Sequence, residues 1–391
     1  MTEVPELRGR AAIVGVADLA SPTGELGMSG REVEVRMATE AIADAGLQMS
    51  DVDAVFASGN YGVSMSIAEH LGIQARYTDS TSVGGSSFEV HVEHAAAALA
   101  LGLCEVALIV YGATPRTTMK AGQKRDRGVP TSELLEWEIP FGLRMPIGGY
   151  ALAASRHMAV YGTTQEQLAS IAVSTREWAR MNPMARYQDP ISTQDVLDSP
   201  FVCEPLHKLD CCLVTDGGGA LVMTSADRAR DLPKPPAYVL GASTCHTHLM
   251  ISAMPDLTVT AASVSGPKAF NMAGIKPGDV DVVETYDSFT ITVLLCVEDL
   301  GFCAKGEGGP FVEGNTLGPG GDLPLNTNGG GLSFTHPGMY GIFPLVEATR
   351  QVRGELAEGR QIDNAQIAVA HGSGGVLSSM STIVLGSEET L

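Results

Sequence analysis

Residues 45–55 read AGLQMSDVDAV, and residues 273–283 read AGIKPGDVDVV. Six of the eleven positions are identical, and the third position pairs leucine with isoleucine. Each copy follows a segment of helical periodicity and leads into a short apolar run, which is the pattern of a helix-to-strand connection. The repeat reflects either a connection common to many α/β proteins or two homologous halves. The long separation between the copies excludes a solenoid and suits two duplicated domains.

Short apolar runs alternate with helical segments on both sides of the repeat. Residues 11–17 and 105–111 are typical of buried strands, and residues 31–47 and 86–103 are typical of helices. Continuous apolar strands that alternate with helices predict an α/β fold with a largely parallel sheet. We expect an N-terminal half over residues 1–230 and a C-terminal half over residues 235–391. A proline-rich insertion at about 114–200 interrupts the first half.

Composition excludes several classes of protein. The chain has 391 residues, of which 44% are hydrophobic, so it can bury a core and is not a disordered protein. A formal charge of −20 argues against nucleic acid or an anionic membrane as a partner. The longest apolar runs are shorter than a membrane span, and the N-terminus lacks a secretion or transit pattern. Seven cysteines without a Cys-x-x-Cys pair favour a reducing compartment, and we expect a cytoplasmic location.

One basic cluster stands out on this acidic chain, at the start of the insertion. It consists of Arg116, Lys120, Lys124, Arg125 and Arg127, with Asp126 as its only acidic residue. The cluster is either a solvated loop or an anion site, for instance for the phosphates of a nucleotide-like carrier.

Four segments fall where open α/β sheets bind ligands, at strand ends and helix starts. They are TSVGGSS (81–87), ETYDSF (284–289), NTNGGGLSFTHPGMYG (326–341) and HGSGG (371–375). Their candidate site residues are Ser82, Gly84, Tyr286, Asp287, His336, Tyr340, His371 and Gly374. A single histidine before proline is typical of a structural turn, and a single tyrosine is typical of a core. The four segments together, in this order, are a more specific signal.

These segments resemble the catalytic loops of the thiolase superfamily, in particular its sterol-carrier-protein-type and lipid-transfer-like branch. The matching motifs are SVGG (82–85), YDSF (286–289), the THP at 335–337 and HGSGG (371–375), and the resemblance covers essentially the whole chain. It implies a thiolase fold, in which two duplicated α/β halves form a five-layered αβαβα core and a loop domain is inserted in the first half. It also implies a CoA thioester as substrate, with no separate cofactor.

The departures from the thiolase pattern concern the reacting groups. Ser82 and Ser288 stand where thiolases carry cysteine, and His371 stands where many have the other cysteine. A serine without a strong base beside it is a weak nucleophile. The sequence therefore argues against ordinary thiolysis. None of the seven cysteines is expected at a thiolase nucleophile position, and those other than Cys296 and Cys303 are expected away from the four segments.

With Tyr286 and Tyr340, the pattern also resembles the thiolase-like aldolases of bacterial steroid side-chain degradation. That resemblance implies retro-aldol cleavage of a β-hydroxyacyl-CoA to a ketone and a shorter acyl-CoA. Tyr286 would take the proton of the β-hydroxyl. His336, with amides near Gly84 or Gly374, would stabilise the enolate, and Tyr340, or a water it holds, would protonate the α-carbon.

Two alternatives stay open: an acyltransferase or condensing enzyme acylated at Ser82, and a non-catalytic acyl-CoA or lipid carrier. The resemblance also implies a homodimer, a small partner with an OB fold and often a zinc ribbon, and CoA phosphates bound by the basic cluster. No metal site is expected, because the histidine pairs at 91/94 and 246/248 lack a carboxylate at metal spacing.

Overall fold

The computed structural model describes residues 7–122, 136–144 and 146–391. Within these residues the largest sheet has nine strands, in the order β3-β2-β4-β7-β1-β8-β11-β10-β9. The strands are β1 (Ala11–Leu19), β2 (Ala54–Phe56), β3 (Tyr77–Asp79), β4 (Val106–Ala113), β7 (Gly217–Ser225), β8 (Ala237–His246), β9 (Val282–Thr285), β10 (Ile367–Gly374) and β11 (Ser379–Gly386).

The strands fall into two groups with the same pairing pattern. In the first group β2 and β4 are parallel, whereas β4–β7 and β7–β1 are antiparallel. In the second group β9 and β10 are parallel, whereas β10–β11 and β11–β8 are antiparallel. A short antiparallel contact between β1 and β8 joins the groups. The duplicated α/β halves are therefore present, while their exact boundary near residues 230–235 stays a prediction.

The expectation of a largely parallel sheet is wrong, because antiparallel pairs outnumber parallel ones among the described strands. The apolar character of the strands has a different cause. Helices cover both faces of the strands, so that most positions along the central strands are buried whatever the strand direction. In β10 and β11, for example, all but one residue is buried.

Both copies of the sequence repeat adopt one local structure. Helix α1 (Gly30–Asp44) precedes Gly46, and helix α10 (Ala262–Ala273) precedes Gly274. The two glycines have φ values of 71° and 72°, in the left-handed region that ends many helices. Further along, Asp53 accepts amide hydrogens from the first residues of β4, and Asp281 accepts them from the start of β10. The identical residues of the two copies thus make equivalent contacts at the starts of two strands.

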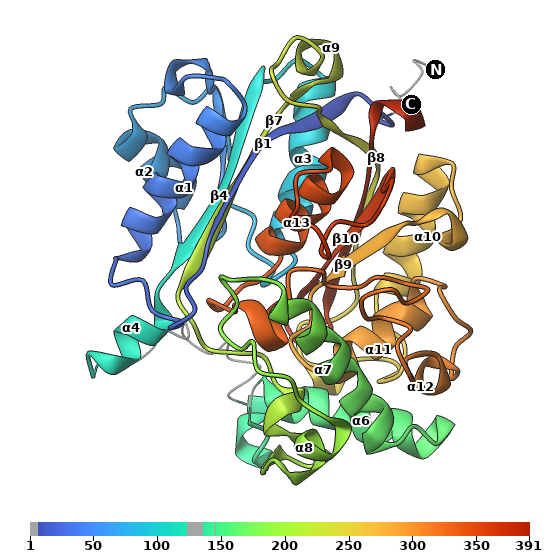
Figure 1. Cartoon of the computed structure of the whole chain (residues 1–391). Helices are drawn as coiled ribbons and strands as arrows, with labels where there is room; N and C mark the ends of the chain where they lie inside the picture. The colour runs from blue at the N-terminus through green and yellow to red at the C-terminus, as the bar shows by residue number, and fades with distance from the viewer. Residues whose placement is uncertain (1–6, 123–135, 145) are drawn as a thin grey trace.

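Five layers result, as Figure 1 shows. Helices α3 (Ser87–Ala100) and α13 (Ile342–Arg353) form the central layer and pack against strands of both groups. Helices α1 and α2 (Val63–Leu71) cover the outer face of the first group, and α10 and α11 (Thr290–Asp299) cover the outer face of the second. This is the expected αβαβα arrangement.

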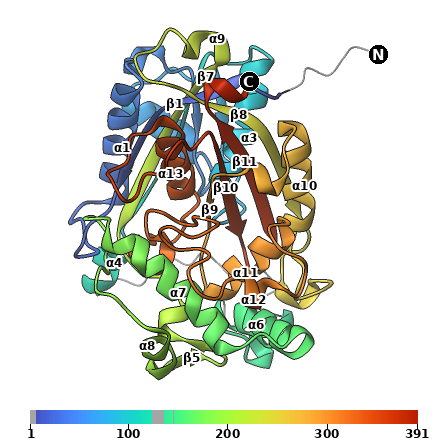
Figure 2. The same ribbon diagram turned by 45° about the vertical axis from the view of Figure 1, so that its right-hand side comes forward.

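The insertion forms a separate group of elements at one end of the molecule, opposite α9 (Ala226–Ala229) (Figures 1 and 2). It contains α4 (Pro115–Lys120), α6 (Ile147–Tyr161), α7 (Gln165–Arg180), α8 (Thr193–Asp198) and, just beyond the predicted bound, β5 (Phe201–Cys203) and β6 (Leu206–His207). Helices α6 and α7 pack on α11, and α7 also packs on the π-helical turn η6 (Gly330–Phe334). The insertion therefore contacts the helix that follows the second segment and the turn that belongs to the third segment. Over the described ranges, no helix has both the length and the apolarity to cross a bilayer.

Candidate active site

Three of the predicted residues meet in a buried cluster. The Tyr286 hydroxyl lies 2.8 Å from Nε2 of His336, and the two rings are nearly perpendicular. The rings of Tyr340 and Tyr286 form a T-shaped pair, with an interplanar angle of 90° and centroids 5.7 Å apart. All three side chains are buried. The second and third segments, which come from different loops of the C-terminal half, thus form one acid–base group.

Burial raises the pKa values of Tyr286 and Tyr340 well above the usual value for a phenol. Both side chains are therefore neutral. A neutral phenol becomes an effective base only when a partner can take its proton. For Tyr286 the structure supplies that partner, because Nε2 of His336 is at hydrogen-bond distance. Tyr340 instead donates its hydrogen to Oδ1 of Asn328, at 2.7 Å.

Tyr286 is positioned by the first and fourth segments. A methyl group at Gly85 would collide with Cε2 of Tyr286, so this position needs glycine. The Tyr286 amide donates to the carbonyl of His371 at 2.9 Å. The first and fourth segments also touch each other, since a Cβ at Gly84 would lie 2.5 Å from the Gly375 nitrogen. All four segments therefore come together, as the sequence predicts.

Asp287 binds the backbone of the third segment. No hydrogen bond joins its carboxylate to Tyr286 or Tyr340 in the described structure. Its carboxylate accepts the amides of Gly331 at 2.6 Å and Leu332 at 3.1 Å, which shapes η6. Burial raises the pKa of Asp287 to about 7, although these two hydrogen bonds favour the charged form. A side chain at Gly330 would collide with the carboxylate, which explains the glycine there.

Two side chains hold the loop that carries His336. Tyr111 donates its hydroxyl to the carbonyl of Pro337 at 2.8 Å and accepts the amide of Met339 at 3.2 Å. Thr215 accepts the His336 amide at 2.7 Å. The imidazole is thus presented from a backbone anchored on both sides.

Ser82, the candidate nucleophile, has no base as its hydrogen-bond partner among the described residues. Its Oγ is exposed and accepts a hydrogen bond from Ser58 Oγ at 3.0 Å. Ser58 in turn is bonded to Ser87 at 3.1 Å. A hydroxyl that is bonded to another hydroxyl gains little nucleophilicity.

Comparison with known proteins shows the family to which the chain belongs. Residues 243–387 match the family described as "Thiolase C-terminal domain-like". A steroid side-chain-cleaving aldolase of Thermomonospora curvata is 37% identical, over 89% of this chain and 91% of its own length. The chain belongs to the thiolase superfamily.

Other members of the superfamily are similar over comparable lengths. A 17-hydroxy-3-oxo-4-pregnene-20-carboxyl-CoA lyase of Mycobacterium tuberculosis is 34% identical, over 89% of this chain and 92% of its own. An acetyl-CoA acetyltransferase of Methanothermobacter thermautotrophicus is also 34% identical, over 93% and 96%. The solved structure named Ltp2-ChsH2(DUF35) aldolase superposes with a TM-score of 0.88 at 34% identity, covering 98% of this chain and 99% of that one.

His371 lies outside the cluster of phenols and His336 in this thiolase-like structure. Strand β10 continues through Gly374, so His371 lies within the strand and not beyond its end. Its Nδ1 lies 2.9 Å from Thr382 Oγ1, which in turn bonds to Ser265 of α10. Burial lowers the pKa of His371 to about 3, so the ring is neutral. Its Nε2 is buried and has no hydrogen-bond partner among the described residues.

Part of the basic cluster is bound to an acid. Arg116 Nε lies 3.2 Å from Glu25 Oε1, and Lys120 Nζ lies 2.8 Å from the same oxygen. Lys124, Arg125 and Arg127 lie outside the described residues. No group of three or more His, Cys, Asp or Glu side chains that could hold a metal ion is found in the described ranges.

Two residues that sequence reasoning missed, Cys212 and Tyr150, lie beside the site. Cys212 donates its amide to the carbonyl of Ser288 at 3.0 Å, and its thiol is near enough to Tyr150 and Tyr286 to raise their pKa values. The expectation that this cysteine lies away from the four segments is therefore wrong. Its segment runs along the second and third segments, with Leu213 bonded to Gly331, and only long-range packing brings it there.

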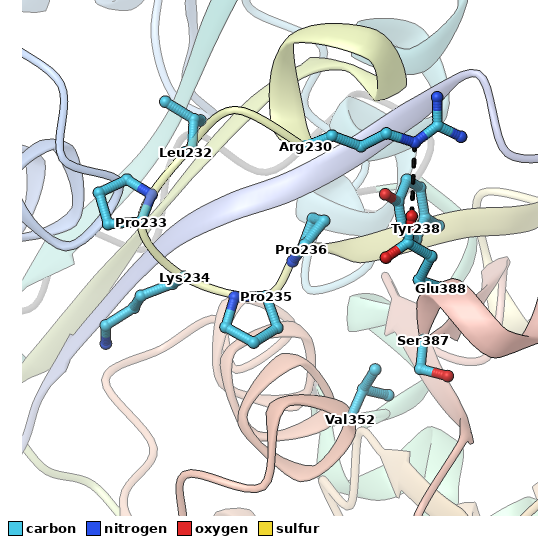
Figure 3. Close-up of a pocket in the computed structure, with 10 residues that line it drawn as sticks. All are labelled: Arg230, Leu232, Pro233, Lys234, Pro235, Pro236, Tyr238, Val352, Ser387 and Glu388. Carbon is cyan, nitrogen blue, oxygen red and sulfur yellow. Dashed lines mark ion pairs between the residues drawn. The ribbon is translucent and has the colours of Figure 1, made fainter.

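A pocket of about 380 Å³ lies elsewhere, at the linker between the halves. Figure 3 shows it lined by Pro233, Pro235 and Pro236 and by the Arg230–Glu388 ion pair, with 3.5 Å between Nε and Oε1. It contains none of the predicted site residues.

Proposed function

We propose that this protein is a carbon–carbon lyase that cleaves a β-hydroxyacyl-CoA by a retro-aldol reaction, giving a ketone and a shorter acyl-CoA. The observation that carries the proposal is the buried Tyr286–His336 hydrogen bond. It is an acid–base pair in a site where Ser82, Ser288 and His371 stand at the cysteine positions of thiolases. The names of the aldolase and lyase relatives support the same reaction.

In the first step the β-hydroxyl of the substrate gives its proton to the Tyr286 oxygen. Tyr286 simultaneously passes its own proton to Nε2 of His336, which becomes an imidazolium. The α–β carbon bond then breaks. The β-carbon becomes a ketone, and the electron pair moves into the thioester as an enolate.

The enolate oxygen needs hydrogen-bond donors that are in place before the reaction. The charged His336 is one candidate, and the amides near Gly84 and Gly374 are others, because these two glycines approach each other closely. Tyr340, or a water it holds, then protonates the α-carbon, and the proton taken up by His336 returns to Tyr340, so that the protein ends the cycle unchanged. Its ring lies against Tyr286, on the same side of the site.

Acyl transfer through Ser82 is the second candidate, since acetyltransferases are also relatives. It requires a base at Ser82, where the structure has Ser58. The third candidate is a carrier without catalysis. A carrier does not require an acid–base pair such as Tyr286 and His336. Neither alternative explains the buried pair as well as the lyase does.

The proposal includes partners. We propose a small accessory protein with an OB fold, often with a zinc ribbon; the DUF35 component named for the similar solved aldolase supports an accessory protein as such. We also propose a homodimer through the sheet edge of the first half, where β3 is the terminal strand. The basic cluster from Arg116 to Arg127 would hold the CoA phosphates. The substrate itself is the CoA thioester, and no further cofactor is needed for these steps.

The test is co-expression with the small open reading frame beside the gene, followed by a screen of β-hydroxyacyl-CoAs for ketone release. The screen includes 17-hydroxy-3-oxo-4-pregnene-20-carboxyl-CoA and short branched and aromatic analogues. Ketone formation in stoichiometric amounts with a shorter acyl-CoA is expected. Acyl transfer to free CoA without ketone release would instead establish the second candidate.

A further inference from the structure

A third phenol, Tyr150, reaches the site from the loop domain. It lies near the start of α6, where Gly149 lets the helix pack closely, since a Cβ there would be 2.6 Å from Val376 Cγ1. The Tyr150 ring is buried and lies 4.4 Å, centroid to centroid, from Phe289 of the second segment. The insertion thus places a polar side chain between the second and fourth segments.

The Tyr150 hydroxyl is only weakly engaged. Its acceptor is the carbonyl of Gly375 at 3.3 Å, which is long for an O–H···O bond. The hydroxyls of Ser288 and Ser373 are near enough to oppose the rise of its pKa, but neither reaches the geometry of a hydrogen bond to it. Ser373 Oγ is buried and has no hydrogen-bond partner among the described residues. Because buried polar atoms are normally paired, a long bond beside an unpartnered hydroxyl indicates a place that a polar ligand completes.

Tyr150 and Tyr286 approach the same region from opposite elements. The Tyr286 ring lies beside Ser373, since a Cβ at Gly85 would collide with Tyr286 Cε2 and would be 2.5 Å from the Ser373 carbonyl oxygen, and the Tyr150 hydroxyl lies at Gly375 of the same segment. Burial raises the pKa of Tyr150 itself to about 12, so it keeps its proton and acts as a hydrogen-bond donor. A substrate oxygen between the two phenols would have a base on one side and a fixed donor on the other.

We propose that Tyr150, assisted by Ser373, forms a subsite for the β-oxygen of the substrate. Tyr150 donates a hydrogen bond to this oxygen while Tyr286 removes its proton, and no proton leaves Tyr150. The bond strengthens as negative charge develops on the oxygen before the ketone forms. The inference rests on the proposed lyase function and deepens it: the loop domain recognises the hydroxyl that the reaction consumes.

The test compares two ligands that differ by this hydroxyl. The probe is 17-hydroxy-3-oxo-4-pregnene-20-carboxyl-CoA, whose hydroxyl is on the β-carbon, and the reference is its 17-deoxy counterpart, which cannot be cleaved. Tyr150→Phe keeps the ring packed on Phe289 and removes only the hydroxyl. Tyr161→Phe is the matched control, because it makes the same change at the end of the same helix, on a partly exposed ring.

For Tyr150→Phe we expect kcat/KM for the hydroxylated probe to fall at least about tenfold. The inhibition constant of the deoxy ligand should stay within about twofold of that of the unaltered protein. Tyr161→Phe should change neither value. A merely structural role of Tyr150 would move both ligands together, and that result, or an unchanged kcat/KM, overturns the subsite.

Failure of the proposed function gives a different result. If the unaltered protein releases no ketone from the probe, the lyase assignment for this substrate fails, and equilibrium binding still tests the subsite. The hydroxylated ligand should then bind more tightly than the deoxy ligand, and Tyr150→Phe should abolish that difference. Equal binding of the two ligands to the unaltered protein would refute the subsite.

Discussion

The Tyr286 hydroxyl and Nε2 of His336 lie 2.8 Å apart, within the buried interior of the site. The two residues are separated by fifty positions in the chain, and each is held by its own set of backbone contacts. This hydrogen bond couples the phenol to a base. It explains how a tyrosine with a strongly raised pKa can still accept a proton from a substrate.

Replacing Tyr286 by phenylalanine should abolish most of the activity. Removing a general base typically lowers kcat by about 100-fold to 10,000-fold, and KM should change little because the ring remains. The measurement is steady-state ketone release. Tyr340→Phe, which also loses the bond to Asn328, should reduce kcat as well. If both variants cleave at nearly the original rate, the tyrosine assignment is wrong.

A methyl group at Gly85 should inactivate the protein without unfolding it. The Cβ of Gly85→Ala collides with the Tyr286 ring, and a displacement of about 1 Å in a catalytic group can cost about 100-fold in rate. Gly278→Ala is the control, because a Cβ there meets no atom within 4 Å. Circular dichroism should show both variants folded. Full activity in Gly85→Ala would mean that the ring has room that the structure does not show.

Ser82→Ala should retain ketone release within a few-fold of the original rate. The hydroxyl is bonded to Ser58 and takes no part in the proposed steps. Intact-mass spectrometry after incubation with substrate should find no added acyl group on the unaltered protein. A covalent adduct that disappears in Ser82→Ala would instead support the acyltransferase.

The basic cluster should bind the CoA part of the substrate and should not contact the acyl group. The double variant Arg125→Ala/Arg127→Ala should raise KM for acyl-CoA, leave kcat unchanged, and weaken the salt dependence of KM. The same acyl group carried on pantetheine lacks the nucleotide and is the matched comparison. Equal loss with both substrates would show that the cluster is not a phosphate site.

Glu89 should make folding less favourable as the pH rises. Both carboxylate oxygens are buried without a hydrogen-bond partner among the described residues, and Oε2 lies against the backbone of Gly341 and Gly372. Burial raises the pKa of Glu89 well above its usual value of 4.5. The folded chain therefore keeps a proton that the unfolded chain releases above pH about 4.5, and stability is lost progressively above that pH.

The neutral variant Glu89→Gln removes this cost. Its Tm should exceed that of the unaltered protein by an amount that grows from pH 5 to pH 8, as measured by thermal unfolding. Glu69→Gln, on the exposed face of α2, should show a constant difference. A Tm difference for Glu89→Gln that does not change with pH would indicate that the carboxyl has a partner in solution.

Much of the fold followed from local sequence signals. The repeat at residues 45–55 and 273–283 predicted two halves, because Gly46 and Gly274 end helices and Asp53 and Asp281 bind the next strand in the same way. Strand direction was not predictable in this manner. Burial on both faces produces the same apolar run in a parallel and in an antiparallel strand, so the sheet was wrongly expected to be largely parallel.

The sequence alone determined the family, the order of the four segments and the candidate roles of Tyr286, His336 and Tyr340. These depend on residue types at short spacings, which a linear chain displays directly. Only the tertiary structure decided which side chains meet. The Tyr286–His336 bond, the direction of His371 toward α10, and the approach of Tyr150 and Cys212 depend on packing between elements far apart in the chain. Periodicity carries no information about such contacts, because they arise only when segments far apart in the chain pack against each other.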